Sequence, residues 1–291
     1  MQKKKVMVLG AGGMAGHVIT LELRKQPSFD VIAVSRSINL ISPDIILDVT
    51  DIKALRNMVL QQKPDIIINC IGTLNEMAEN NPANAILINS YLPHYLEDLT
   101  KSSTTRLIHI STDCVFSGKR GGYVEADPTD GQGYYAQTKA LGEVINNKDI
   151  TIRTSIIGPE LNENGIGLFN WFAKQKGEIK GYTKAYWTGI TTTVLVKAII
   201  EIINQPINGL YHLVSPEKIS KYSLLQIFME SFQGSKVSSI MAFDNYMTDK
   251  SLINTRNDYN LDIPSYQTMV TDMKIWMSEH KELYPHYSTI L

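Results

Sequence analysis

The chain has 291 residues, of which 43% are hydrophobic and 20% are charged, and its formal net charge is −1. This composition suits one large α/β domain, or a domain with a smaller companion, and excludes fibrous and wholly disordered classes of protein. The basic residues are dispersed, so the sequence lacks the positive patch of a nucleic-acid binder. No apolar segment reaches the roughly 20 residues of a membrane helix. We therefore expect a cytoplasmic protein that binds neither nucleic acid nor a membrane.

Short β-branched runs alternate with helical patterns through the first half of the chain, which predicts βαβ units and a buried parallel sheet. The apolar run between Asp65 and Asn69 indicates a strand that is covered on both faces. The predicted strands are Lys5–Leu9, Val31–Val34, Ile45–Asp48, Ile66–Cys70, Leu107–Ser111 and Ile150–Thr154. The predicted helices between them are Met14–Lys25, Ile52–Gln62, Ala83–Thr100 and Tyr135–Ile145.

A glycine-rich turn follows the first predicted strand and leads at once into an apolar helical pattern. Glycines in such a turn allow a tight bend and let backbone amides approach a pyrophosphate at the helix N-terminus. We therefore expect the turn to bind a dinucleotide. The expected contacts are Gly10, Gly12, Gly13, Met14, Ala15 and Gly16.

The end of the second strand bears on the choice of dinucleotide. An NAD enzyme presents a carboxylate to the ribose hydroxyls here, but this chain has Ser35 and Arg36. The Arg36 guanidinium can bind the 2′-phosphate of NADP through two parallel hydrogen bonds. The sequence therefore favours NADPH, with NADH as the alternative cofactor.

Two further strand ends are predicted to line the same site. Asp48, followed by Val49, is suited to holding the adenine edge, although Asp48 could equally cap the next helix. Cys70, Ile71 and Gly72 form a turn of small and apolar residues after the fourth strand, along the expected path of the dinucleotide. These positions converge because open α/β sheets bind ligands at the carboxyl edge of their strands.

Tyr135 and Lys139 are four residues apart on a predicted helix and therefore share one face. A neighbouring ammonium lowers the pKa of a phenol, which makes Tyr135 a candidate general acid. The fifth strand delivers Ser111 and Thr112 to the same edge of the sheet, where a hydroxyl could hydrogen-bond a substrate carbonyl.

The second half of the chain is less periodic. A helix over Thr193–Ile203 and a strand over Gly209–Val214 predict a return to the sheet, and the chain from Ser215 onward is predicted as helices with loops. We expect a Rossmann-type, doubly wound parallel sheet with a smaller, interleaved C-terminal substrate-binding domain. The expected division is residues 1–155, with a return segment near 185–214, for the dinucleotide domain, and 156–184 with 215–291 for the substrate region.

Several motifs together resemble the extended short-chain dehydrogenase/reductases, and within them the dTDP-4-dehydrorhamnose reductase group. The resemblance covers nearly the whole chain. The matching segments are Gly10–Gly16, Lys63–Asn69, Ile110–Gly118, Tyr135–Glu143, Ile152–Gly158 and Asp249–Leu252.

The resemblance implies a triad of Thr112, Tyr135 and Lys139, with Asn89 behind it. It also implies hydride transfer from NADPH to the C4 ketone of a nucleotide-linked 4-keto-6-deoxyhexose. Tyr135 would protonate the alkoxide, Lys139 would bind the nicotinamide ribose, and Thr112 would orient the carbonyl. The remaining expected contacts are Ile156 for the cofactor and Thr73, Asp113, Cys114 and Trp187 for the substrate.

Departures from the group leave the substrate open. Cys114 stands where an aromatic residue is usual, and Trp187 begins a segment that usually contains a proline, so a UDP-linked acetamido deoxysugar is an alternative substrate. A 4,6-dehydratase would carry a glutamate after Asp113, which this chain lacks. The motifs are also compatible with a sugar nucleotide epimerase, and with a regulatory subunit like that of methionine adenosyltransferase.

The remaining reactive residue types are given no catalytic role. Cys70 and Cys114 are expected to be small buried residues, and no metal site is predicted. His109 is expected to be a core histidine, and Trp171 and Phe172 are expected to pack a helix. Relatives of this fold often pair through the helices that precede and contain Tyr135, so a homodimer is one expectation.

Overall fold

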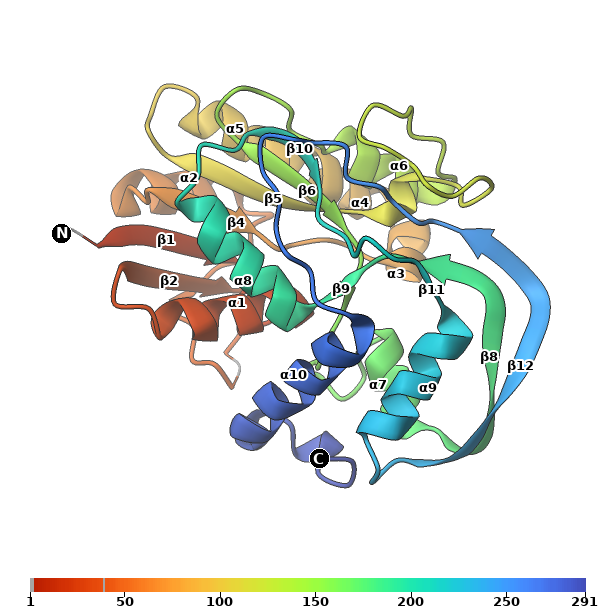
Figure 1. The fold of residues 1–291 in the computed structure, drawn as a ribbon. Helices are drawn as coiled ribbons and strands as arrows, with labels where there is room; N and C mark the ends of the chain where they lie inside the picture. The colour runs from red at the N-terminus through yellow and green to blue at the C-terminus, as the bar shows by residue number, and fades with distance from the viewer. Residues whose placement is uncertain (1–2, 39) are drawn as a thin grey trace.

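The computed structural model describes residues 3–38 and 40–291, and a seven-stranded parallel sheet forms its centre (Figure 1). The order β10-β6-β5-β4-β1-β2-β3 places β1 in the interior of the sheet, where it pairs with β2 and β4. This order and the flanking helices confirm the predicted doubly wound fold. The strands are β1 (Lys4–Leu9), β2 (Phe29–Ser35), β3 (Ile45–Ile46), β4 (Ile66–Asn69), β5 (Arg106–Thr112), β6 (Ile150–Thr154) and β10 (Gly209–His212).

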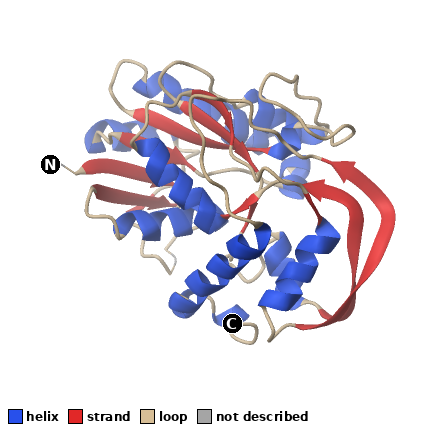
Figure 2. Cartoon of the chain, in the orientation of Figure 1, coloured by secondary structure: helices blue, strands red, loops and turns tan. Residues whose placement is uncertain are grey.

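Helices cover both faces of the sheet (Figure 2). Its strands are therefore continuous apolar runs in the sequence, because both of their faces are buried. Alternate residues of β1 enter different cores: Val6 and Val8 pack with α1 (Met14–Arg24) and α8 (Thr192–Ile203), whereas Met7 and Leu9 pack with α2 (Ile52–Gln62) and α5. The face of the sheet that α2 and α5 cover also carries α6 and a helical run, which extends from α4 through a π-helical turn to α5. Their bounds are α4 (Pro82–Ala85), the π turn (Ile86–Tyr91), α5 (Leu92–Thr100) and α6 (Gly133–Leu141).

A smaller sheet of order β11-β8-β12 projects beyond the central one (Figure 1). Its strands are β8 (Lys176–Trp187), β11 (Ile219–Ser220) and β12 (Lys236–Asp249), and β7 (Ile156–Ile157) pairs with β9 (Ile190–Thr191) nearby. The prediction of helices and loops alone after Ser215 was therefore wrong. The side chains of β12 are mostly exposed or half-buried, so the sequence shows no buried alternation there. The remaining helices are α3 (Asn75–Asn80), α7 (Leu168–Lys174), α9 (Lys221–Ser231), α10 (Tyr266–Glu279) and three short 3-10 turns, Asp113–Val115, Lys281–Leu283 and Pro285–Tyr287.

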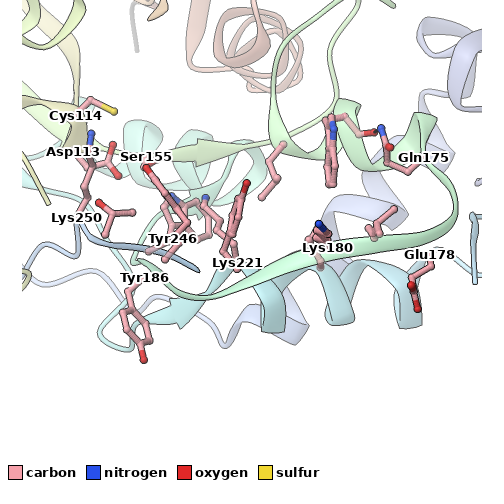
Figure 3. Close-up of a pocket in the computed structure, with 18 residues that line it drawn as sticks. Asp113, Cys114, Ser155, Gln175, Glu178, Lys180, Tyr186, Lys221, Tyr246 and Lys250 are labelled. Carbon is pink, nitrogen blue, oxygen red and sulfur yellow. Dashed lines mark hydrogen bonds between the residues drawn. The ribbon is translucent and has the colours of Figure 1, made fainter. Parts of the chain in front are cut away.

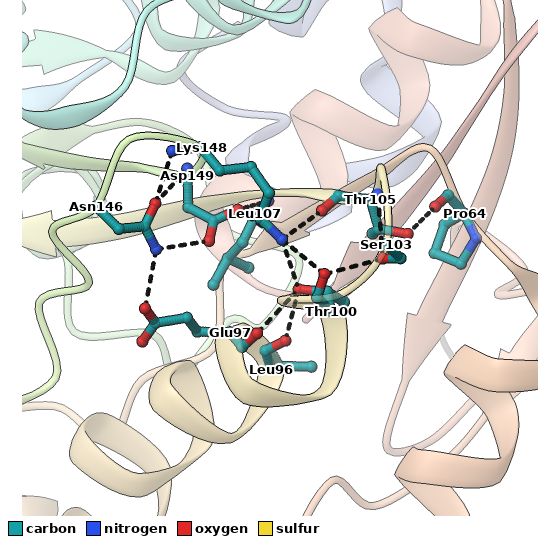
Figure 4. Close-up of polar contacts among 10 residues, drawn as sticks. All are labelled: Pro64, Leu96, Glu97, Thr100, Ser103, Thr105, Leu107, Asn146, Lys148 and Asp149. Atoms are coloured by element: carbon teal, nitrogen blue, oxygen red, sulfur yellow. Dashed lines mark hydrogen bonds and ion pairs between the residues drawn. The ribbon is translucent and has the colours of Figure 1, made fainter.

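A polar network closes the amino edge of the sheet (Figure 4). The carboxylate of Asp149, which is fully buried, accepts hydrogen bonds from the backbone of Leu107 at 2.8 Å and from the Asn146 amide at 2.9 Å. The Lys148 ammonium donates to the carbonyls of Thr100 and Thr105. These bonds fasten α5 to β5 and β6, and the residues predicted for the functional site emerge at the opposite, carboxyl edge.

The predicted helix over Tyr135–Ile145 ends four residues early, at Leu141. The amide of Gly142 caps the helix by donating to the carbonyls of Thr138 and Lys139. A Cβ at Gly142 would lie 1.8 Å from the Asn89 carbonyl oxygen, so the close approach of the two helices requires glycine at this point.

Candidate active site

The glycine-rich turn between β1 and α1 is closely packed. Gly10 has a φ of +82°, and a Cβ at Gly16 would lie 2.1 Å from the Gly10 carbonyl oxygen. Both positions therefore require glycine, as a turn that presents its amides to a phosphate does. The buried His17 ring also contacts this turn, because its Nδ1 lies 2.8 Å from the Gly13 carbonyl oxygen and its Nε2 lies 2.6 Å from the Tyr284 hydroxyl.

A cavity of about 800 Å³, the first cavity, opens beside this turn. Most of the predicted cofactor residues line it: Gly10, Gly12, Gly13, Arg36, Asp48, Val49, Cys70, Ile71 and Gly72. Thr73, which was predicted to contact substrate, lies here too. The lining residues of the described chain do not include Met14, Ala15 and Gly16, which lie in the first turn of α1, or Ile156, which lies on β7.

Asp48 faces the first cavity with its carboxylate held in place. The backbone amide and hydroxyl of Thr50 donate to it at 3.0 and 2.8 Å, and these bonds, helped by the nearby Arg36, lower its pKa. The following helix, α2, is capped by Asp51, whose carboxylate accepts from the Ala54 amide. The alternative that Asp48 caps this helix was therefore wrong.

Thr112, Tyr135 and Lys139 come together at the carboxyl end of β5. The Thr112 hydroxyl and the Cys114 thiol both lie near the Tyr135 phenol. Lys139 is 4% exposed and lies near Cys70 of the first cavity. Cys114 lines a different cavity, whereas Thr112, Tyr135 and Lys139 are not among the described residues that line either one.

The Lys139 ammonium is held by groups on β5 rather than by Tyr135. It donates to the Ile110 carbonyl at 2.7 Å and lies 3.4 Å from Nε2 of His109, whose Nδ1 is 3.2 Å from the Asn69 amide nitrogen. Burial lowers the pKa of Lys139 to about 8, and it lowers the pKa of His109 well below its usual range. His109 is thus buried and neutral, as a core histidine is, and it also contacts the lysine.

Burial raises the pKa of the Tyr135 phenol, and the nearby Cys114 and Asp113 act in the same direction. The Thr112 hydroxyl opposes them, but Lys139 is not among the described groups that act on this phenol. The expectation that Lys139 lowers the pKa of Tyr135 was therefore wrong for this structure. The consequence is that Tyr135 carries its proton at neutral pH.

Two buried polar networks support these side chains. The Asn89 amide donates to the Thr73 carbonyl at 2.9 Å and to the Thr138 hydroxyl at 3.1 Å, which ties the π-helical turn to α6. Behind β5, Glu143 accepts from the Ser111 hydroxyl at 2.8 Å and pairs with Arg153. Sequence reasoning singled out Asn89 through the family resemblance, but it did not find the Glu143 and Arg153 pair.

The second cavity, of about 750 Å³, lies between the central sheet and the smaller one (Figure 3). Asp113, Cys114 and Trp187 line it as predicted. Trp171, on α7, lines it as well, whereas Phe172 is fully buried in the core, as expected of a packing residue. Lining residues that the sequence did not indicate include Ser155, Tyr182, Tyr246, Lys221 and Lys250.

Neither cysteine forms a disulfide. Burial raises the pKa of Cys70 to about 12 and that of Cys114 to about 11, so both remain neutral thiols. Among residues 3–38 and 40–291, no three His, Cys, Asp or Glu side chains are grouped as a metal site would need, and no helix is long and apolar enough to cross a membrane.

Comparison with known proteins identifies the family. The RmlD substrate binding domain family matches residues 4–255. The spore coat polysaccharide biosynthesis protein SpsK of Bacillus subtilis is 30% identical over 78% of each chain, and a dTDP-4-dehydrorhamnose reductase of Aggregatibacter actinomycetemcomitans is 26% identical over 84% of each. The fold is shared with the crystal structure of the dTDP-4-dehydrorhamnose reductase of Bacillus anthracis in complex with NADP, with a TM-score of 0.81. That match has 22% sequence identity and covers 94% of this chain and 100% of the other. The chain thus belongs to the RmlD substrate binding domain family, as the motifs around the glycine turn and Tyr135 indicated.

Proposed function

We propose that the protein is an NADPH-dependent reductase, which transfers hydride to the C4 keto group of a nucleotide-linked 4-keto-6-deoxysugar in polysaccharide biosynthesis. The observation that carries the proposal is Tyr135, a buried, protonated phenol beside Thr112, whose other neighbours Asp113 and Cys114 line the second cavity. One cavity suits a dinucleotide and the other a second large ligand. The names of the relatives, a polysaccharide biosynthesis protein and a dTDP-4-dehydrorhamnose reductase, supply the substrate class.

The residues of the first cavity fit a dinucleotide phosphate. The Gly10–Gly16 turn would hold the pyrophosphate, because its glycines let the chain pack tightly between β1 and the N-terminus of α1, where backbone amides can bind an anion. Arg36 would hold the 2′-phosphate, and Asp48 with Val49 would contact the adenosine half. Bound there, the reduced nicotinamide supplies the hydride.

Each catalytic residue has a separate task in this proposal. Thr112 donates a hydrogen bond that orients the substrate carbonyl, and Tyr135 gives its proton to the carbonyl oxygen as negative charge develops there. The raised pKa of Tyr135 keeps that proton available at neutral pH. Lys139, fixed by Ile110 and His109, would hold the nicotinamide ribose hydroxyls. Residues 156–184 and 215–291 would form the substrate-binding region.

The proposal is tested by mixing the purified protein with NADPH and a 4-keto-6-deoxysugar nucleotide and following absorbance at the nicotinamide band. We expect one NADPH to be oxidised for each keto sugar reduced, and Tyr135→Phe to lower turnover by about two to four orders of magnitude. Tyr134→Phe is the matched control, since this neighbouring phenol is 45% exposed. The absence of stoichiometric oxidation, or a loss below tenfold in Tyr135→Phe, would contradict the proposal, and sugar isomerisation without NADPH consumption would indicate an epimerase.

A further inference from the structure

The second cavity is lined by Lys221, a half-buried residue whose ammonium donors are not used by the described protein. Lys221 is the first residue of α9, and its Nζ lies 4.7 Å from the centre of the Trp187 ring. Within the part of the chain that the structure describes, this ammonium has no hydrogen-bond acceptor and no carboxylate at ion-pair distance. Figure 3 shows Lys221 among the side chains that line the cavity.

Charged neighbours make this end of the cavity positive. Lys221 and Lys250 both act on the Asp113 carboxylate, which is buried and accepts a hydrogen bond from the Thr112 hydroxyl at 3.2 Å. Two ammonium groups therefore face one carboxylate. The nearby Cys114 thiol does not change this balance, because burial keeps it neutral.

An ammonium in this setting is costly unless a ligand satisfies it. Burial disfavours the charged form of Lys221 and lowers its pKa to about 8. The face of Trp187 compensates in part through a cation–π contact, but that contact leaves the three N–H donors of an ammonium unused. An anionic oxygen atom would satisfy both the charge and the donors, by charge-assisted hydrogen bonds that are stronger than neutral ones.

We propose that Lys221, assisted by Lys250, binds anionic oxygen atoms of the substrate at the end of the second cavity nearest Tyr135. This inference rests on the proposed function, because it assigns a specificity role within the same substrate site. It means that the site selects a charged sugar nucleotide over a neutral keto sugar. The anionic oxygens could come from the diphosphate or from a carboxylate on the sugar, since both present the same chemistry to a lysine.

Calorimetric binding to the full-length protein tests the inference without any catalytic step. The probes are a nucleoside, its diphosphate, and the nucleoside diphosphate esters of glucose and of glucuronic acid. The variants are Lys221→Met, which keeps length and removes the charge, and Lys221→Arg, which keeps the charge. Lys197→Met is the matched control, because this lysine lies on α8 with a side chain that is 61% exposed.

If the diphosphate is the anion, Lys221→Met weakens diphosphate binding by about tenfold to a hundredfold, the size of one lost charge-assisted hydrogen bond. Lys221→Arg and Lys197→Met retain most of the affinity, and nucleoside binding does not change. If the carboxylate is the anion, only the preference for the glucuronic acid ester over the glucose ester is lost in Lys221→Met. Either pattern supports the inference.

Unchanged affinity for every probe in Lys221→Met would overturn the inference, as would the absence of any diphosphate or sugar acid binding to the wild-type protein. Failure of the proposed function is a separate result. Lys221-dependent binding with no NADPH oxidation would refute the reductase and leave the anion site standing. Reductase activity with an unchanged KM in Lys221→Met would refute the anion site alone.

Discussion

The buried pair of Glu143 and Arg153 behind β5 allows a quantitative test of what supports the site. Each side chain is 4% exposed, and the guanidinium donates to the carboxylate through two bonds of 2.7 Å. The Ser111 hydroxyl donates to the same carboxylate, and the guanidinium lies over the Phe116 ring, with its carbon 5.1 Å from the ring centre. Nη1 of Arg153 also lies 3.3 Å from Nε2 of His212, so the pair has nearly no access to solvent and three further contacts that hold it.

Arg153→Met removes the guanidinium and leaves the Glu143 carboxylate buried with the Ser111 hydroxyl as its remaining direct donor. Breaking a buried pair from one side costs about 3–5 kcal/mol, because the remaining charge loses its partner without regaining water. That is a large share of the roughly 5–15 kcal/mol by which a folded domain is stable. The double variant Arg153→Met with Glu143→Leu removes both charges, so we expect its stability to return close to that of the wild type.

Urea unfolding at pH 7, followed by tryptophan fluorescence and circular dichroism, measures both effects, provided that the slope with denaturant is unchanged. Lys197→Met is the control: it removes an exposed pair with Asp272, which contributes about 0–1 kcal/mol. The reasoning is refuted if Arg153→Met lies within about 1 kcal/mol of the wild type, the range of such surface pairs. It is also refuted if the double variant is less stable than the single one.

Three further predictions concern ligand binding. Arg36→Ala should weaken NADPH binding at least tenfold and spare NADH, as titration of nicotinamide fluorescence would show, and equal losses would mean that Arg36 does not contact the phosphate. Tyr284→Phe removes the hydroxyl that holds the His17 ring against the Gly13 carbonyl of the glycine turn. We therefore expect NADPH to bind several-fold more weakly at unchanged turnover. An unaltered dissociation constant for NADPH would disprove the role of His17 in supporting the turn. Because the pKa of Lys221 is lowered to about 8, its ammonium is present below that pH and lost above it, so diphosphate affinity should fall as pH rises through 8. Asp113 and Cys114 are the titratable groups that act on Lys221, and a fall that persists in Lys221→Arg would assign the effect to a group other than Lys221.

Local sequence patterns were sufficient for the central sheet and the first cavity. The helix Ile52–Gln62 and the strand Ile150–Thr154 have their predicted bounds, since each carries its periodicity within one buried segment. The glycine turn could be predicted because its function depends on backbone shape, which neighbouring residues determine. Tyr135 and Lys139 could be paired because four-residue spacing places two side chains on one helix face.

Only the tertiary structure determined what those side chains contact. Lys139 could be assigned to a helix face, but its acceptor on β5 and the neighbouring His109 depend on how α6 packs on the sheet. Lys221 and Asp113 are far apart in the chain and line one cavity only because α9 packs near the carboxyl end of β5. Burial, not spacing, then determines that the Tyr135 phenol keeps its proton, because removal from water acts on every charge that the fold encloses.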